Sequence, residues 1–384
     1  MKTTEALILP RPGTVELGEM SLASVGPEDV LIRVTVGGIC MFDVGTFRGT
    51  LKLPFPRYAG HEGAGVIEEV GERVDTVHPG DLVTFNSSPC FARYHVAKAT
   101  NVARVAPGTT DLALWISEPC ACSTNGVRSA RIEPGDDVVL IGAGYMGLLL
   151  VQGLPKEIMR HFVVVDVDDR RLQLARAFGA EIVINSTHQD ALREVQRLTS
   201  TRDATLPKAE RAALAKLLDR PESELEQITL DLSQEGYERL GSAEGRVHDN
   251  FTAAELSLAE HALHRVDCGA DVVIEAAGAP GTLDLASRML RTGGRLSIFA
   301  FHTKREEVPT PLWHMAGLEV QNPAPGFSRN WHEDWRDAVR LLHKGVYRQA
   351  ELITHRFPHT DAQHALEYLA GRPEECIKAV FTFD

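Results

Sequence analysis

The 384-residue sequence has no long hydrophobic run. A helix that spans a bilayer needs about 20 consecutive apolar residues, and no segment approaches that length. Residues 1–5 lead directly into the strand-like segment 6–9, without the apolar stretch of a secretory signal. We therefore expect a soluble protein with a cytoplasmic location and no membrane partner.

Basic residues and cysteines are also scarce. The chain has 40 Lys and Arg against 53 Asp and Glu, a formal net charge of −13, which argues against a nucleic-acid partner because phosphates require a basic face. Six cysteines in a chain of this size do not form the disulfide framework of a small secreted domain, so we expect reduced thiols. The length is sufficient for two domains with their own cores.

Three residue types typical of a catalytic metal site occur in the first third of the chain. They are the thiol of Cys40, the imidazole of His61 and the carboxylate of Glu118. Three such protein ligands leave a fourth position on a zinc ion for water or a substrate oxygen. A lone cysteine is more often a small core residue. Together the three indicate chemistry on an alcohol or carbonyl group.

A glycine fingerprint supports this interpretation. Residues 136–141 read as a buried strand, which is followed by the GAGYMG motif at 142–147 and a helix from 148. In that context Gly142 allows the tight turn, Gly144 admits the pyrophosphate, and Gly147 lets helix pack on strand. Tyr145 and Met146 lie at the helix start that faces the phosphates. The sequence predicts a dinucleotide site.

Asp166 indicates which dinucleotide is used. A second strand, 162–165, ends at Asp166, nineteen residues after Gly147, where a carboxylate accepts hydrogen bonds from the ribose and would repel the 2′-phosphate of NADP. NAD is therefore expected. Arg171 lies five residues further on, where it contacts the ribose edge or forms a surface ion pair, with a phosphate contact as the alternative.

With these motifs in place, the chain resembles the medium-chain dehydrogenase/reductase superfamily, in its zinc-dependent alcohol, polyol (sorbitol) and threonine dehydrogenase branch. The resemblance covers nearly the whole chain. It implies an α/β fold with a GroES-like β-rich catalytic domain (1–118 and 306–384) and a Rossmann domain with a doubly wound parallel sheet (119–305). The matching segments are 38–40 with Asp43, GHExxG at 60–65, 79–83, 118–119, 142–147, 271–278, 293–294 and 377–380.

The resemblance implies that Cys40, His61 and Glu118 bind one catalytic zinc. Glu62 would be an alternate ligand beside the metal, and Asp43 would orient His61 through its other ring nitrogen. Cys120 or Cys122 remain alternatives to Glu118 as third ligand. The structural zinc of the family requires four closely spaced cysteines, and only Cys90 lies in the corresponding region, so no structural zinc is expected.

The resemblance also implies contacts for the cofactor and the substrate. Those expected at the cofactor are Ala277, Phe299 and Phe301 near the nicotinamide and Lys378 near the pyrophosphate. Those expected to line the substrate cleft are Phe42, Phe47, Arg48 and Trp313. For Arg48 a solvated position is the alternative, and for the two phenylalanines at 299 and 301 a place in the core.

Two positions depart from the family pattern. Phe42 stands where a serine or threonine hydroxyl starts the proton relay, and Gly45 stands where a histidine is common. In one interpretation the proton leaves through Glu118, Glu62, water or a ligand hydroxyl. In the other, the enzyme reduces a C=C or C=N bond or runs a redox-neutral reaction.

An insertion at about 201–265 is the third departure. Residues 205–218 read as a helix that starts near Pro207, and 252–255 form a capping-box pattern before a second helix with Leu256, Ala259, Leu263 and Val266 on one face. Its position away from the carboxyl ends of the strands predicts a surface lobe or subunit contact; reaching a neighbour's active site is the alternative.

The predicted function is NAD(H)-linked, zinc-dependent oxidation of a secondary alcohol, of the polyol, sugar or cyclitol class suggested by Glu118. The partner is a small molecule, and a homo-oligomer, dimer or tetramer, is the family habit. The rival classes are a zinc-free quinone or enoyl reductase and a non-catalytic NAD-binding scaffold.

Overall fold

The computed structural model describes residues 2–199, 206–225, 230–241, 251–263, 268–324, 328 and 330–383. It divides into two compact units, Met1–Asn125 with Pro325–Asp384 (unit 1) and Gly126–Ala324 (unit 2). Helix α2 (Glu118–Ala130) contains the first crossing between them. The sequence predicted domain limits at 118 and 306. Both lie earlier in the chain than the observed limits, which follow Asn125 and Ala324.

Unit 1 is rich in antiparallel strands. In β3 (Asp29–Ile39), Val30, Ile32, Val34 and Val36 are buried while the residues between them are not, which is the period of a strand with one face in the core. The main sheet has the order β15-β16-β3-β5-β6-β8, with β7 also paired to β3. The other strands are β5 (Glu62–Val70), β6 (Leu82–Phe85), β7 (Tyr94–Lys98), β8 (Val102–Arg104), β15 (Ile353–Pro358) and β16 (Lys378–Thr382).

Segments from both halves of the sequence complete unit 1. Strand β16 pairs antiparallel with β3, with Val380 opposite Gly38. A second sheet consists of β2 (Thr14–Leu22), β1 (Lys2–Arg11) and β4 (Arg57–Tyr58). The helices of the unit are α1 (Met41–Phe47), α11 (Trp331–His343) and α12 (Ala362–Ala370), besides the start of α2.

Unit 2 contains a six-stranded parallel sheet in the order β11-β10-β9-β12-β13-β14. The two central strands, β9 (Asp137–Ile141) and β12 (Ala270–Glu275), are buried at every position, as expected where helices cover both faces. The chain order reverses between them, and ligands of such sheets bind outside the carboxyl ends of the strands at that point. The predicted Rossmann architecture and mixed α/β class are confirmed.

The remaining elements of the Rossmann part follow the same alternation. Its other strands are β10 (His161–Asp166), β11 (Ile182–Asn185), β13 (Leu290–Ile298) and β14 (Glu319–Gln321). Its helices are α3 (Tyr145–Gly153), α4 (Asp169–Ala177), α5 (Ala191–Thr199), α9 (Thr282–Arg288) and α10 (Thr310–Met315).

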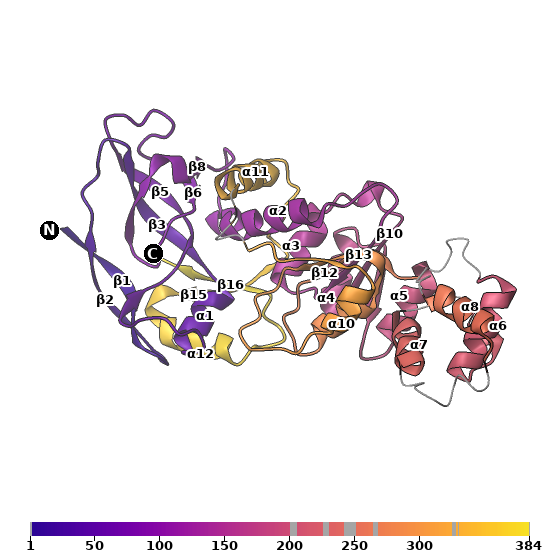
Figure 1. Ribbon diagram of the computed structural model, residues 1–384. Coiled ribbons are helices and arrows are strands. Elements are labelled where there is room, and N and C mark those ends of the chain that lie inside the picture. Colours follow the sequence, from indigo (N-terminus) through magenta and orange to yellow (C-terminus); the bar gives the residue numbers. More distant parts are fainter. Residues whose placement is uncertain are drawn as a thin grey trace. The chain divides into compact units, whose positions relative to one another are not determined.

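The insertion is folded into three helices that contact one another, α6 (Lys208–Leu218), α7 (Leu230–Gly241) and α8 (Ala253–Leu263) (Figure 1). The predicted capping box is present, because Glu255 accepts from the Thr252 backbone N–H at 2.7 Å and donates its own N–H to the Thr252 hydroxyl at 3.2 Å. Buried side chains of α6 and α8 belong to the same hydrophobic cluster as those of the parallel sheet. Val266, expected on the second helix, lies outside the described residues.

No helix in the described ranges combines the length and the apolar character needed to cross a bilayer.

The packing of the insertion can be tested at Leu214, which is fully buried in α6. Leu214→Ala should lower the free energy of unfolding by about 2–5 kcal/mol, because it removes apolar contacts and leaves a cavity. The matched control is Leu17→Ala on β2, where the side chain is exposed and a change within about 0.5 kcal/mol is expected. Urea denaturation measures both, and equal effects would contradict a packed insertion.

Candidate active site

Cys40 is held at the junction of β3 and α1. Its Sγ accepts from the Phe42 backbone N–H at 3.4 Å, as an N-cap side chain does. Asp43 accepts from the Cys40 N–H at 3.1 Å and, with its other oxygen, from the Gly60 N–H at 3.3 Å. One buried carboxylate therefore fixes both the cysteine and the turn that precedes His61.

His61 and Glu62 meet Cys40 at the start of β5. Within the part of the chain that the structure describes, the Cys40 sulfur, a His61 ring nitrogen and a Glu62 oxygen lie within 4.8 Å of one another. Asp43 Oδ1 is 3.9 Å from His61 Nδ1, longer than a hydrogen bond but on the ring side expected for an orienting carboxylate. Gly38 opposite Glu62 makes this possible, because a Cβ there would lie 2.0 Å from Glu62 Oε2.

Lys378 lies in the same cluster, which corrects its predicted contact with the cofactor pyrophosphate. The side chain is 4% exposed, and its Nζ lies 2.6 Å from Glu62 Oε2 and donates to the Ile39 carbonyl at 3.0 Å. A buried charge needs a partner of opposite sign, and Glu62 supplies it. Lys378 opens an otherwise apolar strand, and this local pattern was a signal in the sequence for a buried lysine.

Glu118 begins α2 beside this group. It is not one of the three residues whose ligand atoms lie within 4.8 Å, and its Oε1 accepts from the Cys122 thiol at 3.3 Å. Cys120 is fully buried and donates to the Ile116 carbonyl at 3.7 Å, within its own helix. These contacts favour Glu118 over either cysteine as a ligand, with Glu62 as the nearer carboxylate.

The electrostatics of the cluster favour a cation. Burial raises the pKa of Cys40 and raises that of Glu118 to about 7, with the charge of Glu62 adding to the second shift. Burial alone would lower the pKa of His61, but the hydrogen bond with Cys40 and the charges of Asp43 and Glu118 raise it to about 11. The group therefore takes up protons that a divalent metal ion would replace.

The glycine fingerprint has the geometry that was predicted from the sequence. Gly142 has φ +101°, and a Cβ there would lie 2.7 Å from the Ala277 nitrogen. A Cβ at Gly147 would lie 1.9 Å from the Gly142 carbonyl, so this glycine is required for helix–strand packing. A Cβ at Gly144, the N-cap of α3, would meet nothing within 4 Å, which leaves open space at the helix N-terminus for a phosphate.

Asp166 ends β10 with its carboxylate turned to neighbouring backbone. Its oxygens accept from the N–H groups of Ala143, at 2.5 Å, Val167 and Asp168. Arg171 lies 3.7 Å from Asp168, so the ion-pair alternative for this residue is the one seen. The ribose contact of Asp166 stays a prediction.

A second buried array lies at the carboxyl ends of β12 and β13. Glu275 accepts from the N–H groups of Ala277 and Gly278 and from the Thr282 hydroxyl through one oxygen, and its other oxygen is 2.8 Å from His302 Nε2. His302 Nδ1 is 2.9 Å from Glu306. Partial burial opposes the imidazolium, but the two carboxylates raise the pKa of His302. Sequence reasoning gave neither Glu275 nor His302 a role, although a carboxylate that closes an apolar strand was a visible signal.

The residues expected at the nicotinamide flank this array. The backbone N–H of Phe299 donates to the Glu275 carbonyl, and Phe301 is exposed. Ala277 is held by Glu275 and lies against Gly142. Their cofactor contacts stay predictions.

The four residues predicted to line the substrate cleft lie in different environments. Phe42 is 38% exposed, and its ring lies edge-on to that of His61, with centroids 6.1 Å apart. Phe47 is 4% exposed in the core of unit 1, because it lies on the inner face of α1 with Val44, so its predicted place in the cleft is wrong. Arg48 is exposed and donates to the Ala370 carbonyl, and Trp313 packs on the core of unit 2 while its indole N–H donates to Ser287.

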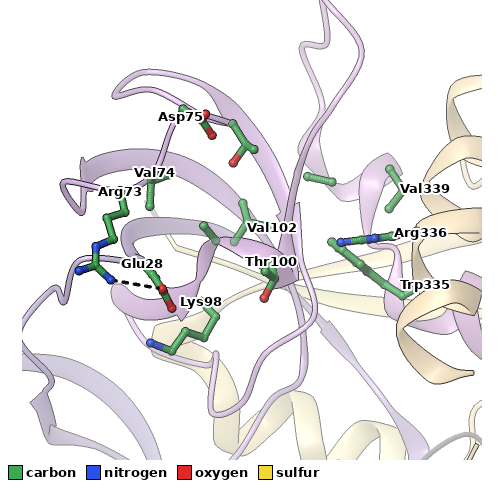
Figure 2. Close-up of a pocket in the computed structure, with 13 residues that line it drawn as sticks. Glu28, Arg73, Val74, Asp75, Lys98, Thr100, Val102, Trp335, Arg336 and Val339 are labelled. Carbon is green, nitrogen blue, oxygen red and sulfur yellow. Dashed lines mark ion pairs between the residues drawn. The ribbon is translucent and has the colours of Figure 1, made fainter. Parts of the chain in front are cut away.

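A cavity of about 420 Å³ lies elsewhere in unit 1 (Figure 2). Val102, Trp335 and Val339 form its apolar wall, and Arg73 faces Glu28 across an ion pair at its rim. None of the residues predicted for the active site lines it. The cavity is therefore separate from the candidate metal cluster.

Comparison with known proteins adds the family. The alcohol dehydrogenase GroES-like domain matches residues 26–124, which include Cys40, His61 and Glu118. An L-threonine 3-dehydrogenase from Anaeromyxobacter sp. (strain Fw109-5) is 33% identical over 45% of this chain, and the match spans only 59% of that relative. A sorbitol dehydrogenase from Halalkalibacterium halodurans is 24% identical over 93% of this chain and 92% of its own length.

The chain therefore contains an alcohol dehydrogenase GroES-like domain and is similar over most of its length to dehydrogenases, as its resemblance to the medium-chain dehydrogenase/reductase superfamily implies. It is accordingly an enzyme, an oxidoreductase of the alcohol dehydrogenase type that acts on CH–OH groups. A solved structure described as a short chain alcohol dehydrogenase from Escherichia coli CFT073, complexed with NADH, shares the fold, with a TM-score of 0.67, 21% identity and 99% of each chain covered.

The array around His302 should make stability depend on pH. A raised pKa in the folded state means that the stabilisation is complete below the unfolded value of about 6.5 and is lost as pH rises through the folded value. Chemical denaturation from pH 6 to 9 should therefore show a smaller loss of stability for His302→Gln than for the wild type. His314→Gln, at an exposed position on α10, is the control; an unchanged pH slope in His302→Gln would contradict the ionic array.

Proposed function

We propose that the protein is a zinc-dependent, NAD-linked oxidoreductase that transfers hydride between a secondary alcohol and the nicotinamide. The observation that carries the proposal is the meeting of Cys40, His61 and Glu62 within 4.8 Å, with Glu118 beside them. Sulfur, imidazole and carboxylate ligands in this number are typical of catalytic zinc sites.

The residues present fit zinc. Burial raises the pKa of the Cys40 thiol and of the Glu118 carboxyl, and, against the effect of burial, the acidic neighbours of His61 raise that of its imidazole; in their deprotonated forms these three groups are ligand types that zinc binds. When bound, Zn²⁺ supplies a Lewis acid that lowers the pKa of a coordinated substrate hydroxyl. Cys40 and His61 are the expected ligands, together with Glu118 or Glu62.

The surrounding side chains hold the ligands in place. Asp43 anchors Cys40 and lies beside the far nitrogen of His61, and Lys378 holds one oxygen of Glu62. Neither Phe42 nor Gly45 can carry a proton. Where Glu62 is the third ligand, Glu118 is the carboxyl group beside the cluster that can hold or release a proton at the substrate oxygen.

NAD is the proposed cofactor. Open space at Gly144 and the unblocked N-terminus of α3 suit a pyrophosphate, and Asp166 at the end of β10 suits a ribose diol. The NADH complex of the structural neighbour from Escherichia coli supports this. The cofactor, when bound, accepts or donates the hydride.

The substrate class of polyols, sugars or cyclitols remains a prediction, supported by Glu118 and by the sorbitol dehydrogenase relative. Phe42, which lacks the relay hydroxyl, keeps open the alternative of C=C or C=N reduction or a redox-neutral reaction on the same scaffold. A homo-oligomeric dimer or tetramer and a cytoplasmic location are further expectations.

Metal content and turnover test the function together. Purified protein should contain about one zinc per chain by plasma mass spectrometry and should form NADH, followed by absorbance, with a panel of secondary alcohols. Cys40→Ala and His61→Ala should lose both properties, and Cys376→Ala, outside the cluster, should keep them. Protein that turns over carbonyl-conjugated alkenes without zinc would contradict the proposal and favour a zinc-free reductase.

Cofactor choice can be tested at Asp166. Asp166→Ala should lower kcat/KM for NAD by about 10- to 100-fold, because hydrogen bonds to a charged carboxylate contribute about 1.5–3 kcal/mol, and should raise that for NADP by removing repulsion. Asp190→Asn, at an exposed position before α5, should leave the ratio unchanged. A wild type that prefers NADP would overturn the assignment.

A further inference from the structure

An exposed aromatic side chain, Phe42, lies beside the metal cluster. Phe42 follows two residues after Cys40, and its ring meets that of His61 edge-on, with 38% of the residue exposed. Isolated exposed apolar side chains need no explanation, but this ring lies against His61, a zinc ligand in the proposed function, whose side chain is itself 26% exposed.

The position of this ring is fixed by the same contacts that fix the ligands. The Phe42 N–H donates to Cys40 Sγ, and the Phe42 carbonyl accepts from the Thr46 hydroxyl at 2.8 Å. Asp43, the next residue, binds the Cys40 and Gly60 N–H groups. The aromatic face is therefore held at a set place relative to Cys40 and His61.

Two of the three carboxylates in this cluster are withdrawn from solvent, whereas Glu118 is partly exposed and accepts from the Cys122 thiol. Glu62 is 1% exposed and paired with Lys378, and Asp43 is buried and bonded to backbone N–H groups. A polyol would lose water from its hydroxyls against the Phe42 ring without receiving hydrogen bonds from these groups. Such desolvation costs more than burying an apolar substituent.

We propose that the site selects secondary alcohols that carry an aryl or branched alkyl group next to the carbinol carbon, which packs on Phe42, over fully hydroxylated polyols. This rests on the proposed function, oxidation of a secondary alcohol, and replaces the polyol, sugar or cyclitol class expected from Glu118. Phe42 acts as a specificity residue: it supplies apolar contact area where a hydroxyl would supply a proton path.

The test compares kcat/KM for 1-phenylethanol with kcat/KM for sorbitol, using zinc-loaded enzyme and NAD. The wild-type ratio should exceed about 10, and Phe42→Ala should lower it by about tenfold through loss of apolar burial. Phe42→Leu, which keeps an apolar side chain, should stay within about threefold of the wild type. A change in the proton route would alter kcat/KM for both alcohols by the same factor, so the ratio of the two values would not change.

Met41→Ala is the matched control, because Met41 is exposed on the same turn but makes no ring contact with His61 in the structure; its ratio should match the wild type. A readout without turnover is the Kd of each alcohol for the enzyme–NADH complex, followed by NADH fluorescence. Phe42→Ala should weaken binding of 1-phenylethanol about tenfold and leave sorbitol unchanged. Circular dichroism and thermal melts check that the variants fold.

The outcomes separate the two proposals. A wild type that oxidises sorbitol better than 1-phenylethanol, or a Phe42→Ala ratio equal to that of the wild type, would overturn the inference and leave the zinc- and NAD-dependent function standing. Failure of the wild type to bind or oxidise either alcohol would overturn the function itself.

Discussion

The ion pair between Glu62 and Lys378 holds together the part of unit 1 on which the proposed chemistry depends. The two side chains are 1% and 4% exposed, and they come from strands β5 and β16 on either side of β3. Removing either charge would take from the other its ion-pair partner in the interior, which typically costs about 3–5 kcal/mol. Because Glu62 also lies among the metal-ligating atoms, the pair couples the stability of the sheet to the charge of the cluster.

The cluster contains more acidic than basic groups. Among the described residues of the cluster, Cys40, Asp43, Glu62 and Glu118 are acidic, and His61 and Lys378 are basic. Burial, followed by the charge of Glu62, raises the pKa of Glu118, burial raises that of Cys40, and, against the effect of burial, the hydrogen bond with Cys40 and the charges of Asp43 and Glu118 raise that of His61. A divalent cation satisfies the same excess without protons. The environment therefore favours metal binding more at neutral and alkaline pH than in acid, since ligands must lose their protons to bind.

Much of the architecture was predictable from the sequence because local patterns encode it. The strand, glycine fingerprint and helix at 137–153, the carboxylate at the end of β10, and the capping box of α8 each depend on residues a few positions apart. Cys40, His61 and Glu62 were predictable for the same reason, through the 38–43 and 60–65 motifs. Their meeting is set by the pairing of β3 with β5.

The predictions failed at residues whose surroundings are set by contacts between segments far apart in the sequence. Lys378 was assigned to the pyrophosphate because no local rule gives the register that sets β16 against β3 and turns its first side chain toward Glu62. The pairing of His302 with Glu275 was not predictable because Glu275 ends β12, 27 residues earlier in the chain. The family resemblance placed Phe47 in the cleft, whereas its helical spacing from Val44 indicated the inner face of α1. The structure follows the helical spacing.

The participation of β16 in the metal environment has a consequence for biosynthesis. Cys40 and His61 leave the ribosome long before Lys378, so for most of translation Glu62 has no ammonium partner and β3 lacks one of its neighbours in the sheet. In that state the nascent chain has an incomplete sheet, and the negative charge of Glu62 is not neutralised by a lysine. The buried pair and the last edge of β3 can therefore form only after the C-terminal strand has been synthesised.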